Sequence, residues 1–374
     1  MRNFVTGLVA VAALLAFAPS EAGAYMVNDA HQIYGYGQVL LLLSEDATEG
    51  DTVQTAGGEN GKTTAFGFKD RRFRSGMKGD LLGGAVYYNV MMESAGGSVK
   101  LVDYWFGVRG GAMYAQFGRF RPFITWEESM TSASGLKNID RDAGLTALTA
   151  AFFAQNASSR DLGLKFGFGD PAKDPLSLLF SVTNGSGANM AVGGDVSGGA
   201  VYSNAVGDAA YAVGLVAHMG GHGQFTASYA MNKHNGATLA GTELTAIDID
   251  RTVYSVGAEY AIVPQFLWLD GEYAHIKAGS NDFDFPDAEM TAWFVRAGIF
   301  LIPTKLELVG RMAKEADKGI VHGAPDHERT TDETEVTLNY YLGEAFKVQM
   351  EYATFSPEGE SSYNAIRTQF QIKF

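Results

Sequence analysis

The sequence contains no cysteine, few prolines and few charged residues for its length. Of its 374 residues none is Cys, 9 are Pro and 19% are charged. The lack of cysteine excludes disulfide scaffolds, thiolate metal sites and cysteine nucleophiles. The formal net charge of −14 argues against a nucleic-acid partner, because phosphate recognition needs a basic footprint. With 46% hydrophobic and 12% aromatic residues, the chain is too apolar for intrinsic disorder.

Long hydrophobic runs are also scarce, and the most continuous one lies at the N-terminus. Arg2 precedes an uncharged apolar run over residues 4–17, and Ala22-Gly23-Ala24 provides small residues at a cleavage site. This run is shorter than the ~20 residues that a membrane-spanning helix needs. The pattern predicts a cleaved secretory signal peptide over residues 1–24 and a mature chain over 25–374.

The mature chain shows period-two alternation in place of helical spacing. In residues 161–168, for example, Leu162, Leu164 and Phe166 alternate with glycine and lysine. Alternation of this kind indicates strands with one apolar and one polar face. The strands run to about 10 residues, which suits tilted strands that cross a bilayer better than soluble sheets with ~5 to 6 residues per strand. We therefore predict an all-β protein, a transmembrane antiparallel β-barrel.

Counting back from the C-terminus gives about 16 strands, although 18 remains open. The predicted strands cover residues 363–374, 346–355, 333–342, 305–314, 289–300, 266–277, 250–262, 223–233, 209–219, 175–183, 161–168, 112–120, 99–109, 81–92, 63–75 and 32–43. Short Gly- or Pro-marked turns, among them 76–80 and 343–345, alternate with mostly longer, acidic loops. An even strand count puts both termini on one side, as in bacterial outer-membrane barrels.

One long segment interrupts the strand pattern. Residues 121–160 show no clean alternation, and residues 143–154 have the composition of a short helix. We assign the whole segment to the third outer loop, since an extra strand there would invert every turn and loop on one side of it. A barrel of this size has a lumen wide enough for water. The segment is therefore expected to fold inward as a constriction loop.

Three stretches of the sequence carry a family resemblance. They are residues 117–123 (Phe-Gly-Arg-Phe-Arg-Pro-Phe) with 127–132, residues 159–164 and residues 184–189. They resemble, in the same order, segments of the phosphate-selective porin O and P family of Gram-negative outer-membrane porins. The C-terminal Phe374, with Phe370 and Ile372 on the same face, resembles the signal read by the outer-membrane assembly machinery. The resemblance implies a homotrimeric passive channel with about 16 strands.

The inward loop supplies the candidates for ion selectivity. The candidate residues, taken with the preceding strand end, are Arg119, Arg121, Glu127, Glu128, Lys137, Asp140, Arg141, Asp142 and Arg160. Their charges nearly cancel, so we expect weak selectivity with an anion or phosphate preference at the constriction. Charged rings set selectivity in pores through their local field. The leading candidates for that preference are Arg119, Arg121, Arg141 and Arg160.

Other charged or metal-ligating groups are better explained by structure. His218 and His222 flank a turn, where a spacing of four does not align two metal ligands. A second set, His322, Asp326, His327 and Glu328, is read as part of an exposed loop. The basic run Lys69, Arg71, Arg72 and Arg74 is predicted near the periplasmic end of its strand. That run could recruit anions from inside or lie at the lipid interface.

No enzyme signature or cofactor motif is present. The sequence lacks a Gly-x-Ser-x-Gly elbow, a Walker loop and a His-Glu-x-x-His motif. We expect a non-enzymatic outer-membrane channel without a cofactor, whose partners are membrane lipid, the assembly machinery, copies of itself and small solutes or ions. Two alternatives stay open: a barrel that sheaths a multihaem electron carrier, and a surface receptor or adhesin.

Overall fold

The computed structural model describes most of the chain. The described residues are 25–28, 30–45, 55–57, 63–95, 98–153, 159–185, 209–237, 247–279, 287–320 and 328–374. The predicted signal peptide, residues 1–24, lies outside them. No helix within these ranges is both long and apolar enough to cross a membrane.

The described residues form eighteen strands, two α-helices and one short 3₁₀ turn, Leu82–Gly84. The strands are β1 (Tyr25–Asn28), β2 (His31–Glu45), β3 (Thr55–Gly57), β4 (Thr63–Leu81), β5 (Val86–Ala95), β6 (Ser98–Gly110), β7 (Met113–Phe120), β8 (Asp161–Phe168), β9 (Leu176–Thr183), β10 (Ala210–His218), β11 (Gly223–Ala237), β12 (Ile247–Val263), β13 (Leu267–Gly279), β14 (Ala288–Ile302), β15 (Leu306–Lys318), β16 (Arg329–Leu342), β17 (Phe346–Pro357) and β18 (Tyr363–Lys373). The helices are α2 (Trp126–Met130) and α3 (Ala143–Phe152).

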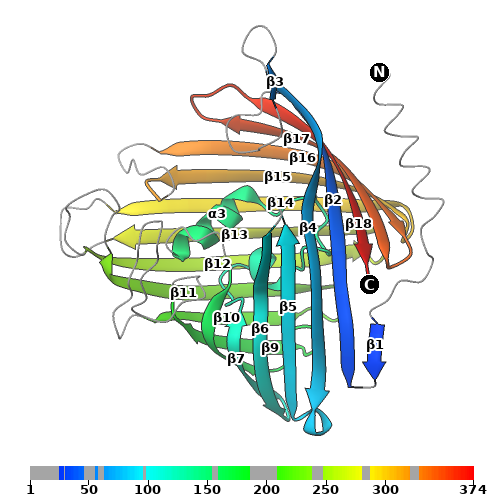
Figure 1. Cartoon of the computed structure of the whole chain (residues 1–374). Helices are drawn as coiled ribbons and strands as arrows, with labels where there is room; N and C mark the ends of the chain where they lie inside the picture. The colour runs from blue at the N-terminus through cyan, green and yellow to red at the C-terminus, as the bar shows by residue number, and fades with distance from the viewer. Residues whose placement is uncertain are drawn as a thin grey trace.

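The sheet closes on itself as an antiparallel barrel (Figure 1). Within the described residues, β2 and β4 to β18 make sixteen wall strands, while the short β1 and β3 add to the edges of β2 and β4. Closure comes from β18 pairing with β2, with Lys373 opposite Tyr36. The predicted count of 16 is confirmed.

The two faces of each strand differ in the predicted way. On β9, Leu178 and Phe180 point outward with exposed fractions of 46% and 40%, whereas Ser177 and Ser181 point inward with 0% and 3%. The same alternation continues around the ring. Exposed Leu, Phe and Val side chains in such a band are stable only against lipid or another protein.

The position of one turn was wrong in the sequence-based prediction. Residues 76–80 were expected to form the turn after the second strand, but β4 continues to Leu81 and turns at residues 82–84. Gly76 and Gly79 serve close packing instead: a Cβ on Gly76 would stand 2.7 Å from the carbonyl oxygen of Val90, and one on Gly79 would stand 2.3 Å from His31 Nδ1. Glycine at these two strand positions allows Val90 and His31 to approach the backbone of β4 closely.

The segment after β7 enters the barrel, and α3 lies inside the ring of strands (Figure 1). Its side chains Leu145, Leu148 and Phe152 are buried in one apolar cluster with inward residues of the wall, including Ile276 and Met290. Burying a Leu or Phe side chain contributes about 1.5 to 3 kcal/mol. The predicted inward loop and its helix are both confirmed. The apolar contact packs the loop against the wall that contains Ile276 and Met290.

Candidate functional site

The inward loop, described over residues 121–153 and 159–160, is fixed to one side of the barrel by carboxylates of the wall. Glu272 on β13 accepts hydrogen bonds from the backbone N–H of Trp126 at 2.5 Å and of Glu127 at 2.9 Å. Glu351 on β17 accepts the N–H of Ile139 at 2.8 Å. Hydrogen bonds to charged groups contribute about 1.5 to 3 kcal/mol each, so the backbone of the loop has little freedom here.

Ion pairs reinforce the same contact. Arg296 on β14 bridges Asp270 at 2.8 Å and the loop carboxylate Glu127 at 2.9 Å. Asp140 in the loop pairs with Arg367 at 2.7 Å and also with Arg71. A buried carboxylate such as Glu127 is stable only when it is paired or hydrogen-bonded, and the wall arginines pair with both loop acids.

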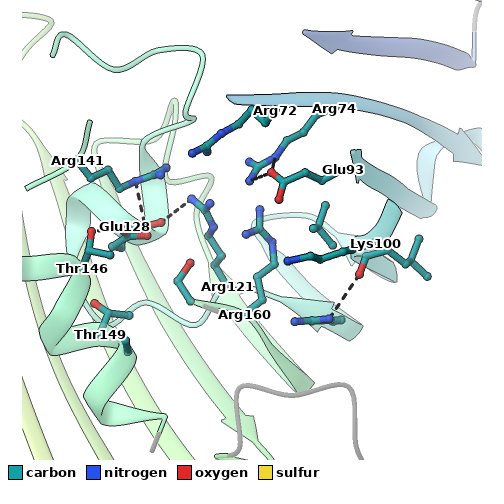
Figure 2. Close-up of a pocket in the computed structure, with 15 residues that line it drawn as sticks. Arg72, Arg74, Glu93, Lys100, Arg121, Glu128, Arg141, Thr146, Thr149 and Arg160 are labelled. Atoms are coloured by element: carbon teal, nitrogen blue, oxygen red, sulfur yellow. Dashed lines mark hydrogen bonds and ion pairs between the residues drawn. The ribbon is translucent and has the colours of Figure 1, made fainter. Parts of the chain in front are cut away.

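On the other side of the loop a cavity of about 400 Å³ remains open toward β4, β5 and β6. In Figure 2, Arg121 and Arg160 reach into the space between the loop residues Glu128 and Thr146 and the strand residues Arg74 and Glu93. The charged residues lining this cavity are seven bases and two acids: Arg72, Arg74, Lys100, Arg119, Arg121, Arg141, Arg160, Glu93 and Glu128. The lining is therefore strongly positive, in contrast to the net negative chain.

The cavity arginines are held in place by short contacts. Arg74 Nε donates to Glu93 at 2.6 Å, and Arg160 Nε donates to Asp103 at 2.7 Å. Arg121 Nη1 donates to the carbonyl oxygen of Glu128 at 2.6 Å. Within the described residues, Arg72 and Lys100 have neither an ion pair nor a hydrogen bond from their side chains. Both charges are thus available to a passing solute.

The crowded charges change the pKa values of the loop residues. Burial, together with the neighbouring charges of Arg160 and Arg141, lowers the pKa of Arg121 well below its usual range. Burial alone would raise the pKa of Glu128, but Arg141 and Arg121 outweigh it and the pKa is lowered. A bound anion would offset the repulsion that Arg160 and Arg141 exert on Arg121.

On the far side of the loop two acids shift in opposite directions. Burial would raise the pKa of Asp140, but Arg71 and Arg367 outweigh it and lower the pKa to about 2. Asp142 caps α3 by accepting the N–H of Leu145 at 2.8 Å, and burial raises its pKa to about 8. Neither side chain lines the cavity.

The structure divides the predicted selectivity residues into two groups. Those lining the cavity are Arg119, Arg121, Glu128, Arg141 and Arg160. Those turned to the opposite wall are Glu127, Lys137, Asp140 and Asp142. The sequence suggested that the loop charges nearly cancel around the pore. In the structure Glu127 and Asp140 pair with wall arginines and Asp142 caps α3, which leaves Glu128 as the one loop acid among them that lines the cavity. The cancellation of charge therefore does not extend to the cavity.

A bulge in β4 supplies bases that the sequence did not assign to the constriction. Gln38 pairs with Arg72 and Val39 with Asp70, which leaves Arg71 as the extra residue. A bulge of this kind breaks period two, so that adjacent residues can serve the same face. Arg71 reaches Gln369 at 2.7 Å inside the barrel, and Arg72 lines the cavity. The prediction that the basic run faces the lumen agrees with these positions of Arg71 and Arg72. The predicted place near the periplasmic end of the strand was wrong, because the run lies in the middle of β4.

The remaining candidates have structural positions. His218 Nε2 lies 3.0 Å from the carbonyl oxygen of Pro171, and His222 packs beside Tyr260. Of the second histidine set, residues 322, 326 and 327 lie outside the described residues. In the part of the chain that is described, no three His, Asp or Glu side chains are placed to share a metal ion.

The C-terminal residues close the barrel seam. Phe370, Ile372 and Phe374 alternate with buried Gln369 and Gln371 and so share the outer face. The backbone of Phe374 exchanges two hydrogen bonds with Gly35, at 2.8 and 3.0 Å. A signalling role for these residues stays a prediction.

Comparisons with known proteins agree with this architecture. A family model described as "Phosphate-selective porin O and P" matches residues 49–374. The sequence matches none of the curated proteins with which it was compared.

Solved structures with a similar fold include an anion-selective porin from Comamonas acidovorans, at 11% identity and a TM-score of 0.64, covering 92% of this chain and 99% of that one. The outer-membrane expressed OmpT of Vibrio cholerae has 11% identity and a TM-score of 0.62, covering 93% and 99%. A trimer form of in-vitro folded OmpT, also from Vibrio cholerae, has 12% identity and a TM-score of 0.57, covering 92% and 100%.

Proposed function

Because the chain belongs to the phosphate-selective porin O and P family, we propose that it is an outer-membrane channel that prefers small hydrophilic anions. The observation that carries the preference is the lining of the cavity beside the inward loop, with seven bases and two acids. Transport is passive, and solutes diffuse through the lumen along their gradient.

The preference arises from the separation of charge across the inward loop. Its acids Glu127, which is buried, and Asp140, which is partly exposed, form ion pairs with wall arginines, which cancels much of their field. Arg72 and Lys100 face the cavity without a carboxylate partner among the described residues. Local charge of this kind sets selectivity in a pore, whatever the net charge of the chain.

Planar-bilayer recording of the purified protein tests the proposal. We expect stable ohmic steps and, under a KCl gradient, a reversal potential of the sign that reports chloride preference. A strong cation preference would reject the selectivity. A silent barrel would reject the channel and favour the alternative of a sheath, which copurification of a haem protein would support. A receptor or adhesin would lose binding on loop deletion while keeping its conductance.

The segments at the two ends of the chain support export to the outer membrane. Residues 1–24 have the sequence pattern of a signal peptide, and the chain ends with the outward-facing side chains of Phe370, Ile372 and Phe374. We propose cleavage before Tyr25 and recognition of the C-terminal residues by the assembly machinery. Mass spectrometry of the mature protein tests the first, and deletion of Phe374 with measurement of membrane insertion tests the second. We propose no catalytic activity for the protein.

The shortest of the wall strands support a homotrimer. Strands β7 to β10 contain 8, 8, 8 and 9 residues. At a tilt of ~40° eight residues rise only about 20 Å, less than an apolar band of ~25 Å. Their outward side chains include Phe117, Phe166 and Phe180, all at least 40% exposed. Contact between copies of the chain would cover the exposed side chains of β7 to β10. The mass of the detergent-solubilised complex tests whether the protein is a trimer.

A further inference from the structure

A second cavity lies at the rim where both chain ends and the short turns gather. It measures about 260 Å³ and takes its lining from β1, Ala30, β2, β4, β5 and β6. Lys78 follows Arg74 on β4, and Tyr87 and Asn89 precede Glu93 on β5, each by an even number of residues. Because alternate residues of a strand share a face, these three side chains lie on the lumenal side with the basic cavity, whereas Gly79 and Tyr88 line the cavity from the other face at the rim. Both cavities therefore lie along one wall of the same channel.

The lining combines aromatic rings with one free ammonium group. The rings of Tyr87 and Trp105 meet edge to face with centroids 5.4 Å apart. Lys78 Nζ lies 5.2 Å from the centroid of the Tyr34 ring and has no carboxylate partner within the described residues. Gln32 and Asn89 add amide groups. Aromatic faces bind rings, and an ammonium binds an anionic group.

The carboxylate of Asp80 does not neutralise the charge of Lys78 in this cavity. Asp80 is ion-paired at 2.7 Å with Arg109, whose guanidinium lies 5.1 Å from the centroid of the Tyr87 ring. The group formed by Lys78, Arg109 and Asp80 thus keeps a positive charge. An inorganic anion would use only that charge, and a neutral ring would use only the aromatic surface.

We propose that this second cavity binds organic anions that carry a ring, with the ring against Tyr87 and Trp105 and the anionic group at Lys78. The proposal rests on the proposed channel function and adds a site in series with the basic cavity. Lys78 lies four positions after Arg74 on β4, about 14 Å along the strand. Two sites in series allow a solute to leave one for the other, as conduction through a binding pore requires.

The test measures block of the chloride current by solutes added at the turn side of the channel. Phenyl phosphate carries an aromatic ring, glucose 6-phosphate a sugar ring, inorganic phosphate no ring and glucose no charge. We expect at least one of the two ring-bearing phosphates to block at lower concentration than inorganic phosphate. Which of them responds identifies the kind of ring.

Variants separate the two features of the site. Trp105→Leu should raise the half-blocking concentration of the ring-bearing phosphate about 2- to 13-fold, the range for one aromatic contact, and leave inorganic phosphate unchanged. Lys78→Gln, at an exposed position, should weaken block by every phosphate. Trp293→Leu is the matched control, because Trp293 lies on the outer face of β14.

The outcomes distinguish this site from the channel itself. Normal conductance with equal block by ring-bearing and inorganic phosphates would overturn the site and leave the channel standing. Equal effects of Trp105→Leu and Trp293→Leu would also overturn it. Absence of any conductance in the unmodified protein would overturn the channel. Unchanged heat-modifiable gel mobility confirms that each variant is folded.

Discussion

Replacing Arg72 by glutamine removes one charge from the basic cavity and leaves no acid without its partner. A sphere with the 400 Å³ of the cavity has a radius of about 4.6 Å. That volume is the space open to the centre of a small solute, so a lining nitrogen lies about 3 Å farther out and its charge stands about 7.5 Å from an anion at the centre. Their interaction is about 0.6 kcal/mol in the dielectric of water and about 1.1 kcal/mol at half that value. The affinity of the site for a monovalent anion should therefore fall about 2.5- to 6-fold.

Single-channel conductance measured against KCl concentration gives that affinity as the half-saturating concentration. Recording should extend down to ~10 mM salt, because the Debye length there is ~30 Å and screening is weak. Lys173→Gln is the matched control: it removes the same charge from an exposed turn residue, 79% exposed, whose one ion pair within the described residues is with Asp170. A half-saturating concentration that stays the same in Arg72→Gln, or rises equally in both variants, would refute the assignment of the cavity.

The anchoring of the inward loop predicts three further outcomes. Glu272→Ala leaves the amide of Trp126 without its acceptor, which costs about 1 to 3 kcal/mol, and single-channel current should become noisier. Burial raises the pKa of Asp142 from 3.8 to about 8, so its stabilising contribution is complete below pH 3.8 and is lost as the pH rises toward 8. Hydrogen exchange of α3 should accordingly accelerate between pH 6 and pH 9 more than the intrinsic rate does, and Asp142→Asn should remove that excess. Gly144→Ala places a Cβ 2.9 Å from that of Ala292, and melting should show a loss of about 1 to 3 kcal/mol.

Each of these outcomes has its own control. Glu272→Gln keeps one acceptor oxygen and should restore much of the quiet current; equal noise in both variants would contradict the tethering role. An excess acceleration of exchange that persists in Asp142→Asn would assign the pH effect elsewhere. Gly310→Ala adds the same methyl group where no atom lies within 4 Å, so it should be nearly neutral.

Much of the fold follows from the sequence because lipid and lumen impose opposite polarity on alternate residues. That constraint acts on every strand, so the strand count and most turns could be predicted from local pattern alone. The inward loop was predictable from the failure of alternation over residues 121–160, and α3 from the composition of residues 143–154. Arg121, Arg141 and Arg160 could be placed near the constriction because they lie on that loop or at its ends.

The partition of charge between cavity and wall depended on tertiary structure. Nothing local distinguishes Glu127 from Glu128, yet the first pairs with Arg296 on β14 and the second faces the cavity. The bulge that turns Arg71 and Arg72 into the lumen is a property of the pairing between β2 and β4. Sequence by itself determined which residues touch lipid, since that depends on period two within one strand. Only the closed barrel decided which charges a solute meets, because that depends on contacts between different strands and the inward loop, such as the pairing of Glu127 with Arg296.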